Sequence, residues 1–291
     1  MKPPPFAYDA PERIDDVLAL LAEHADDAKV LAGGQSLVPL LNFRLARPAR
    51  LVDVNRVGAL DYVRRRDGQL HVGALTRQAA LERSSIVARH WPLLHEALGW
   101  VAHPQIRNRG TVGGSIAHAD PAAELPVALA ALDGTVHVRS RRGDRAIGWE
   151  DLFVTHLTTS LESDELLVEI EVPPLAPGTG CAFTEYARRH GDFGLGGAAA
   201  TVTLDAAGTC RRASIALLGA APTPVRATEG EALLAGRPVD EPATREAAAA
   251  AVRDVRPTGD IHGGTAYRRR LIEAMVRRAI TTAARRAAPE D

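Results

Sequence analysis

The sequence contains only two cysteines, Cys181 and Cys210, which are far apart and form no Cys-x-x-Cys pair. A zinc site or an iron–sulfur cluster usually takes several such ligands, so this chain alone cannot build either one. No apolar run reaches the roughly 20 residues that a membrane-spanning helix needs. The first residues also show no apolar signal segment. We therefore expect a cytoplasmic protein with no membrane span.

Basic residues are not in excess, since 35 Lys and Arg residues are balanced by 36 Asp and Glu residues and the net charge is -1. A general nucleic-acid-binding protein would carry a basic surplus that neutralises phosphates. The Gly-x-x-x-x-Gly-Lys-Ser/Thr pattern of P-loop ATPases and the Gly-x-Ser-x-Gly pattern of serine hydrolases are also absent. We therefore expect no nucleic-acid partner and neither of these enzyme classes.

Two short motifs are present but are rejected as functional sites. Residues 194–199 match the dinucleotide-binding pattern Gly-x-Gly-x-x-Ala. A true fingerprint opens a helix, whereas the residues that follow here alternate and include Val and Thr, as in a strand. His118 and Asp120 come closest to a metal-ligand pair, but such a pair is more typical of a capped loop. We expect no metal site.

With 291 residues, of which 46% are hydrophobic, the chain is long enough for two domains with full cores. Alternation and short apolar runs predict strands at 29–32, 51–54, 60–65, 70–73, 135–140, 166–172, 182–186, 198–204 and 212–218. Helical spacing predicts an amphipathic helix through Ile14, Val17, Leu18 and Leu21, and helices at 76–87, 92–98, 122–132, 228–234, 243–252 and 264–286.

Smaller sequence features refine this outline. Thr76 is the expected N-cap of its helix, and residues 141–145 form a charged turn. The final helix should bury Tyr267, Leu271, Met275 and Ala279 and expose its Arg-rich face. Pro and Gly cluster at 173–178, which predicts a boundary between domains 1–175 and 176–291. The terminal residues 287–291 are expected to be disordered.

The segment 103–126 is the strongest candidate for a binding site. It contains Gly113 and Gly114, a Ser and two carboxylates, with few apolar residues to bury. Two successive glycines permit positive φ and let a ligand approach the main-chain N–H groups, as in anion-binding nests. Asp120 and Glu124 can accept hydrogen bonds from sugar-type hydroxyls. The alternative is a tight loop followed by an N-capped helix.

An earlier segment has the same organisation. A predicted strand ends at Ala32 and is followed by Gly33, Gly34, Gln35 and Ser36, and then by an apolar turn. A strand that leads through a Gly-Gly turn into a helix start leaves unpaired N–H groups, which favour phosphate. The repetition of this pattern favours ligand binding over a purely structural role.

Together these motifs resemble the FAD-binding medium subunit of molybdenum hydroxylases, the family of carbon monoxide dehydrogenase and xanthine dehydrogenase. The resemblance rests on AGGQSL at 32–37, IRNRGTVGGS at 106–115 and HADPAAELP at 118–126, and it extends through 188–193 and 267–271. It implies an α+β fold. The first domain would be an FAD-binding domain of two subdomains, of the type shared with p-cresol methylhydroxylase and vanillyl-alcohol oxidase. A C-terminal domain with a three-stranded antiparallel sheet and helices would follow.

The resemblance also implies a set of cofactor-binding residues. The two glycine loops would hold the FAD pyrophosphate from two sides, Asp120 and Glu124 would contact its hydroxyl-bearing parts, and Leu167 would lie by the adenine. Phe193 takes the place of a Tyr or an aliphatic residue near the flavin ring, so contact there would be apolar. The implied positions are Leu31, Ala32, Gly33, Gly34, Gln35, Ser36, Leu37, Val101, Gly110, Thr111, Val112, Gly113, Gly114, Ser115, Asp120, Glu124, Leu167 and Phe193.

Because the chain has only two cysteines, the iron–sulfur clusters of such an enzyme would be on another chain. The leading hypothesis is noncovalent FAD that relays electrons from a [2Fe-2S] small subunit to NAD+, a quinone or oxygen. A large subunit would carry the molybdenum cofactor, in a dimer of heterotrimers. Two alternatives remain open. One is a stand-alone flavin oxidase or dehydrogenase, and the other is a non-catalytic assembly factor with the same fold.

Overall fold

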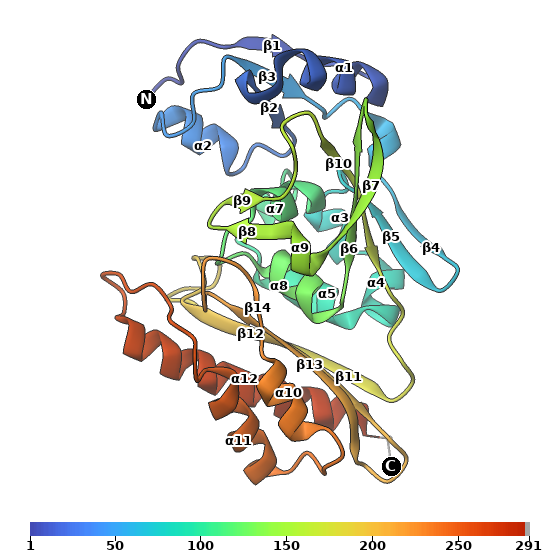
Figure 1. Ribbon diagram of the computed structural model, residues 1–291, viewed down its shortest axis with the longest axis vertical. Coiled ribbons are helices and arrows are strands. Elements are labelled where there is room, and N and C mark those ends of the chain that lie inside the picture. Colours follow the sequence, from blue (N-terminus) through green and yellow to red (C-terminus); the bar gives the residue numbers. More distant parts are fainter. Residues whose placement is uncertain (289–291) are drawn as a thin grey trace.

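The computed structural model describes residues 1–288, which form three stacked parts with the two ends of the chain at opposite poles (Figure 1). The first part is a small parallel sheet of order β1-β3-β2. Its elements are β1 (Ala7–Asp9), α1 (Ile14–His24), β2 (Ala28–Leu31), α2 (Leu37–Asn42) and β3 (Arg50–Asp53). Helix α1 covers this sheet with Val17, Leu18 and Leu21 buried, as its apolar spacing predicts.

The second part is a five-stranded antiparallel sheet of order β4-β5-β10-β6-β7, with β10 in the centre. The strands are β4 (Val63–Arg66), β5 (Gln69–Gly73), β6 (Thr135–Ser140), β7 (Gly143–Gly148) and β10 (Leu166–Val172), with a separate hairpin of β8 (Phe153–Thr155) and β9 (Thr158–Thr159). The helices are α3 (Gln78–Glu82), α4 (Ser85–His90), α5 (Pro92–Trp100), α6 (Pro104–Arg107), α7 (Val112–His118), α8 (Glu124–Ala131) and α9 (Trp149–Leu152).

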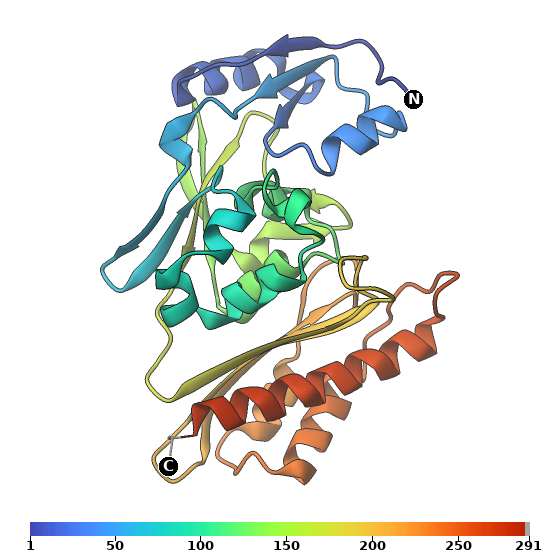
Figure 2. The ribbon, with the colours of Figure 1, turned by 180° about the vertical axis from the view of Figure 1, so that it is seen from behind.

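The third part is an antiparallel sheet of order β11-β12-β13-β14, made of β11 (Thr179–Tyr186), β12 (Gly196–Leu204), β13 (Cys210–Leu218) and β14 (Val225–Arg226). The three expected strands are confirmed, and the two-residue β14 is added at the edge. Helices α10 (Thr228–Leu234), α11 (Glu241–Ala251) and α12 (Thr265–Ala287) follow. Helix α12 packs along one face of the sheet, and the helices of the second part lie toward the other face (Figure 2).

The hydrophobic cores do not follow the three parts strictly. One core belongs to the first sheet and another to the sheet and helices of the third part. The central core combines the second part with residues from beyond position 175. These are Cys181, Phe183, Ala199, Ala216 and Leu218. The five-stranded sheet and the C-terminal sheet are therefore joined by continuous apolar packing.

One expected helix is interrupted. Residues 76–87 were expected to be helical from Thr76 onward, but they form α3 and α4, separated by a break at Ser84, which caps α4 with its side chain. Thr76 is not an N-cap. Its hydroxyl bonds both the N–H and the carbonyl of Tyr62, so a contact with the β4 segment replaces the cap. The hydrogen bonds of Thr76 and Ser84 thus replace one long helix by two short ones.

Several strands and one helix face also differ from expectation. Strands β1, β7, β8 and β9 were not predicted, and the turn before β7 is limited to Arg141 and Arg142. Helix α12 buries Met275 and Ala279 as expected, but Tyr267 is exposed and Arg268 is buried, because Arg268 pairs with Asp260 at 2.6 Å. The terminal run 287–291 was expected to be disordered, yet Ala287 closes α12, and residues 289–291 lie outside the described residues.

Candidate functional site

The first glycine loop, residues 31–37, leads from the end of β2 into α2. Gly34 adopts φ +74°, and its carbonyl accepts the N–H of Val38 at 3.0 Å. The Gln35 side chain folds back to donate to the Gly33 carbonyl at 2.9 Å. These contacts hold the loop in a tight turn, and the positive φ explains why glycine occupies position 34.

The main-chain N–H groups of this loop are available to a ligand. In the described part of the chain, none of the N–H groups of residues 33–37 donates a hydrogen bond. Ser36, the N-cap of α2, makes no side-chain capping bond that would occupy one of them. Successive unpaired N–H groups in a tight turn form a concave site with partial positive charge, which favours an anion such as phosphate.

The second glycine loop, residues 110–115, is anchored differently. The N–H groups of Val112 and Gly113 donate to the carbonyls of Thr76 and Ala74 at 3.0 and 2.9 Å. Thr111 caps α7 and accepts the Gly114 N–H at 3.1 Å. The N–H of Ser115 donates to the Thr111 carbonyl. Most N–H groups here are already used, so this loop is rigid rather than an open donor surface.

The two loops touch each other through their backbones. A Cβ atom on Gly33 would lie 2.5 Å from the carbonyl oxygen of Arg109 and 2.8 Å from the Cα of Gly110. Gly113 is needed for a similar reason, since a Cβ there would lie 2.6 Å from the Ala74 Cβ. A Cβ on Gly114 would lie 2.6 Å from the Thr111 hydroxyl oxygen and 3.9 Å from the Ala32 Cβ of the first loop. Packing thus explains all three glycines, and Gly114 is the one that faces the first loop.

A polar bridge of Asn55 and Arg77, which was not predicted, links the loops. The Asn55 side chain donates to the Ala32 carbonyl at 2.7 Å and accepts a hydrogen bond from Arg77 at 2.7 Å. Arg77 also donates to the Arg109 carbonyl. Burial and the nearby charge of Arg109 lower the pKa of Arg77. Asn55 follows β3 and Arg77 precedes α3, so only the fold brings them together.

Val101 lies just before the second loop, at the end of α5. It is buried in the central core, and its carbonyl accepts a hydrogen bond from the Arg107 guanidinium at 2.8 Å. Arg107 is itself held by a two-point ion pair with Glu82, at 2.9 and 3.0 Å. This buried pair fixes the path of the chain from Val101 into the second loop.

Asp120 and Glu124 lie beyond α7, where the chain turns into α8. One carboxylate oxygen of Asp120 accepts the Ala122 N–H at 2.8 Å, and the other lies 4.0 Å from His118. Burial, with the charge of Asp120, raises the pKa of Glu124 from its ordinary value of 4.5 to about 7. Burial lowers the pKa of His118, and Asp120 opposes this effect.

A third carboxyl group, Glu185 on β11, completes this acidic group and was not identified from the sequence. It is buried, and one of its oxygens has no hydrogen-bond partner in the described chain. Burial and the charge of Glu124 raise its pKa to about 9. Glu185 lies 61 residues from Glu124 in the sequence, so no local pattern signals the pair.

Phe193 and Leu167 belong to segments other than the two loops, and Leu167 shares the central core with Val112 of the second loop. Phe193 is 76% exposed, in the connection between β11 and β12. That connection packs against His103, because a Cβ on Gly191 would lie 2.2 Å from the His103 ring. Leu167 is buried on β10 beside Val168, whose carbonyl accepts the N–H of Ala74. The structure thus brings the two loops together, while Leu167 supports them from the core.

The comparisons with known proteins identify the family. Residues 4–175 match the family described as FAD binding domain in molybdopterin dehydrogenase. The chain belongs to this family. Residues 181–283 match the CO dehydrogenase flavoprotein C-terminal domain. The resemblance inferred from the two glycine motifs is confirmed, and the protein is an FAD-binding oxidoreductase subunit of the xanthine and CO dehydrogenase type.

Relatives of this flavoprotein family align over the whole chain. The 6-hydroxypseudooxynicotine dehydrogenase complex subunit alpha of Paenarthrobacter nicotinovorans is 49% identical and covers 99% of this chain and 98% of its own. The caffeine dehydrogenase subunit beta of Pseudomonas sp. (strain CBB1) is 41% identical over 98% and 97% of the two chains.

A solved structure also confirms the fold. A chain of the carbon monoxide dehydrogenase from Hydrogenophaga pseudoflava superposes with a TM-score of 0.96 at 38% identity, covering 99% of this chain and 100% of that one. The expected α+β architecture is therefore correct. Among residues 1–288, no helix is both long and apolar enough to cross a membrane.

Proposed function

We propose that this flavoprotein holds FAD noncovalently between its two glycine loops. The main support for this proposal is the row of N–H groups at residues 33–37, which donate to no group of the described chain. They suit the pyrophosphate, because an anion in a turn of this kind accepts several main-chain hydrogen bonds at once. Gly114 lies on the opposite side, where a Cβ would be 3.9 Å from Ala32 and 2.6 Å from the Thr111 hydroxyl oxygen. These features fit the cofactor of the family.

The second loop has a supporting role in this proposal. Its N–H groups at residues 112–115 are bound within the protein, so it shapes the site rather than donating a second row of hydrogen bonds. The remaining members of the first loop lie at the two ends of the turn, with Leu31 and Ala32 before it and Leu37 at the start of α2. In the second loop, Gly110 and Val112 are fixed by bonds to Gln78 and Thr76.

The acidic group continues the proposed site toward the C-terminal sheet. Asp120 keeps one oxygen outside its turn hydrogen bond, and that oxygen can accept from a ribityl or ribose hydroxyl. Glu124, with its pKa raised to about 7, can donate as well as accept. We assign Val101 and Phe193 to apolar contact with the flavin end and Leu167 to support of the adenine end.

The role of the chain is electron transfer within a larger enzyme. When bound, FAD supplies redox chemistry that can couple one-electron donors to two-electron acceptors. We propose that the electrons come from a [2Fe-2S] small subunit and leave to NAD+, a quinone or oxygen. A large subunit with the molybdenum cofactor would oxidise the substrate, in a cytoplasmic dimer of heterotrimers.

The relatives support a substrate site on another chain. Full-length relatives carry names that refer to 6-hydroxypseudooxynicotine, caffeine and carbon monoxide, which have little chemistry in common. A chain that aligns over nearly its whole length while the named substrate changes so much is best explained as a shared electron-transfer part. We also propose that domains 1–175 and 176–291 serve cofactor binding and assembly respectively.

The deciding experiment is the visible absorption spectrum of the purified chain, followed by mass analysis of what heat releases. A yellow protein that releases intact FAD is the expected result. Gly114→Glu should abolish flavin retention through steric clash and charge repulsion. Gly58→Glu is the matched control, since Gly58 has no heavy atom within 4 Å of a Cβ position.

The outcomes separate the competing functions. A colourless chain that takes up no added FAD would reject the proposal and favour an assembly factor. Substrate turnover by the yellow chain without partners would favour a stand-alone oxidase or dehydrogenase. Reduction of the bound flavin only when a reduced [2Fe-2S] protein is added would support electron relay.

A further inference from the structure

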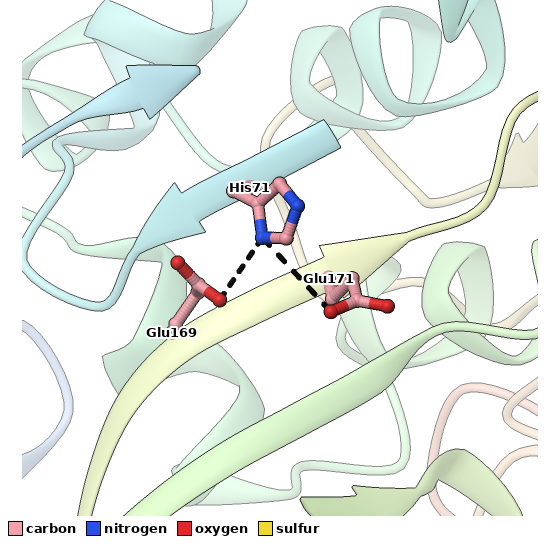
Figure 3. Close-up of side chains that lie close together, drawn as sticks. All are labelled: His71, Glu169 and Glu171. Atoms are coloured by element: carbon pink, nitrogen blue, oxygen red, sulfur yellow. Dashed lines mark hydrogen bonds and ion pairs between the residues drawn. The ribbon is translucent and has the colours of Figure 1, made fainter. Parts of the chain in front are cut away.

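Four side chains gather on the polar face of the five-stranded sheet, apart from the glycine loops. Two histidines come from the strands on either side of β10, and two glutamates come from β10 itself. This histidine–glutamate cluster consists of His71, His137, Glu169 and Glu171. Figure 3 shows three of its members, with the His71 ring directed at both carboxylates. No metal site was expected from the sequence, because residues so far apart in the chain carry no local signal.

The strand register explains the arrangement. Glu171 is paired directly with His71 on β5, and Glu169 is paired directly with His137 on β6. Residues two apart on a strand point to the same face, so both glutamates lie between the two imidazoles. The alternate residues, including Ile170 and Val172, face the central core. The backbone thus holds all four side chains on one face.

Three members of the cluster lie close enough to share a single small cation: one ligand atom each of His71, Glu169 and Glu171 lies within 4.8 Å of the other two, and His137 is outside this group. The Nδ1 atom of His71 lies 3.0 Å from Oε1 of Glu169 and 3.9 Å from Oε2 of Glu171. The Nε2 atom of His137 lies 3.8 and 2.9 Å from the same two oxygens. Ligand atoms about 2.0–2.1 Å from a tetrahedral zinc ion are separated by about 3.4 Å. The two separations of His71 lie on both sides of that value.

The charges leave a role for a cation. Two carboxylates side by side on one sheet face repel each other unless a positive group lies between them. The basic residues of the neighbouring strand positions are engaged elsewhere, since Arg64 stacks over the Tyr62 ring and Arg139 pairs with Asp144 at 3.1 Å. A divalent cation beside neutral imidazoles would balance the two carboxylates.

A further hydrogen bond orients one ligand. The Tyr62 hydroxyl donates to Oε2 of Glu169 at 2.6 Å, which leaves Oε1 directed at His71. Outer partners of this kind fix the orientation of metal ligands in established sites. The side chains of the cluster are between 17% and 34% exposed, so an ion can enter from solvent without local unfolding.

We propose that the histidine–glutamate cluster binds one divalent transition-metal ion, of which Zn²⁺ is the best match. Mixed imidazole and carboxylate ligands in tetrahedral placement favour Zn²⁺ over Mg²⁺, which prefers six oxygen ligands. His71, Glu169 and Glu171 would supply three of the four positions and water the fourth, while His137 hydrogen-bonds Glu171 beside the ion. The ion would tie β5 to β10 on the face away from the core.

The test is calorimetric titration of the full chain, with any affinity tag removed, using ZnCl₂ as the probe. One saturable site per chain is expected, with no comparable heat from MgCl₂. His71→Gln or Glu171→Gln should weaken Zn²⁺ binding at least tenfold, and Tyr62→Phe about tenfold, by analogy with measured outer-partner effects. His24→Gln is the control, because His24 contacts only one carboxylate, Glu23 at 3.7 Å, and is no part of the cluster.

X-ray absorption at the zinc edge of the loaded protein makes the test independent of the variants. One imidazole and two carboxylate oxygens from the protein are expected in the first coordination sphere, with water in the remaining position. The proposal would be overturned by the absence of saturable binding, by equal affinity in His71→Gln and wild type, or by a zinc environment without imidazole. Circular dichroism of each variant confirms that a loss of binding is not a loss of fold.

Discussion

Gly33 and Arg109 lie in backbone contact, although 76 residues separate them in the sequence. No side chain fits between them, since a Cβ on Gly33 would lie 2.5 Å from the Arg109 carbonyl oxygen. The first glycine loop is therefore positioned by the second. Any group that separates them also displaces the N–H groups of residues 33–37.

Gly33→Ala should accordingly weaken FAD binding. Overpacking of this kind costs about 1–3 kcal/mol, which corresponds to a loss of about fivefold to 150-fold in affinity. The measurement is the flavin-to-protein absorbance ratio of the purified chain, followed by titration of the apoprotein with FAD. Gly58→Ala, at an open position of the same part, should keep the wild-type ratio. Full flavin occupancy in Gly33→Ala would show that loop contact does not control the site.

The bridge through Arg77 and Asn55 should be required for the same geometry. Arg77→Ala leaves the Arg109 carbonyl and the Asn55 side chain without a donor, at a cost of about 1–3 kcal/mol. We expect lower flavin affinity and a lower midpoint of thermal unfolding. Arg83→Ala removes an exposed arginine of the adjoining segment and should change neither quantity. Equal values in the two variants would contradict the bridge.

The acidic pair predicts how stability depends on pH. The pKa values of Glu124 and Glu185 are raised to about 7 and about 9 from an ordinary value of 4.5. Between pH 4.5 and these values the folded protein holds protons that the unfolded chain has lost, so raising the pH favours unfolding. The free energy of unfolding should fall across this window, by up to about 1.4 kcal/mol per pH unit for each proton.

Glu185→Gln tests this dependence, because it removes one titrating group and keeps the side-chain size. Urea unfolding from pH 5 to pH 9 should show a shallower decline than wild type and greater stability at the alkaline end. Glu23→Gln, at an exposed position, should leave the profile unchanged. A wild-type profile that is flat or rises over this range would reject the buried, protonated pair.

The packing of α12 on β11 predicts a large effect at Gly180. A Cβ there would lie 2.0 Å from the Ala283 carbonyl and 2.4 Å from the Ala287 N–H nitrogen, both in the helix backbone. Gly180→Ala should lower the free energy of unfolding by about 1–3 kcal/mol. Gly99→Ala, inside α5 with no neighbour within 4 Å, should be neutral or gain up to about 1 kcal/mol. Calorimetric unfolding compares the two, and no difference would contradict the tight packing.

Elements with strong local signals were predictable from the sequence. The strands of the C-terminal sheet and the hairpin β4–β5 follow from alternation and from turn residues such as Asp67 and Gly68, both of which take positive φ. The rejection of residues 194–199 as a dinucleotide fingerprint is confirmed, because they run into strand β12 instead of opening a helix.

The departures from prediction arise where tertiary contacts outweigh local preference. Thr76 has a good N-cap side chain, but the Thr76 hydroxyl instead accepts a hydrogen bond from the backbone N–H of Tyr62 and donates one to the Tyr62 carbonyl. Arg268, one turn before the buried Ile272, is itself buried although it is charged, because its guanidinium donates to the Leu195 carbonyl and pairs with Asp260. Spacing along the chain contains no information about such partners.

The candidate site divides in the same way. Residues 31–37 and 110–115 are contiguous motifs and could be identified from the sequence alone. Asn55, Arg77 and Glu185 are single polar residues whose importance appears only when folding places them beside these motifs. A contiguous motif can therefore be recognised in the sequence, whereas the distant residues that position it become apparent only in the folded structure.

The central core that crosses position 175 also limits how this protein can be divided. Phe183 and Leu218 of the C-terminal sheet pack with the apolar residues of the second part, and the Trp91 indole bonds the Pro173 carbonyl at 2.8 Å. A fragment ending at residue 175 would expose the apolar surface that packs against the C-terminal sheet, and it would tend to aggregate. Exchange of C-terminal domains between homologues would succeed only where the apolar residues on both sides of this interface come from the same homologue.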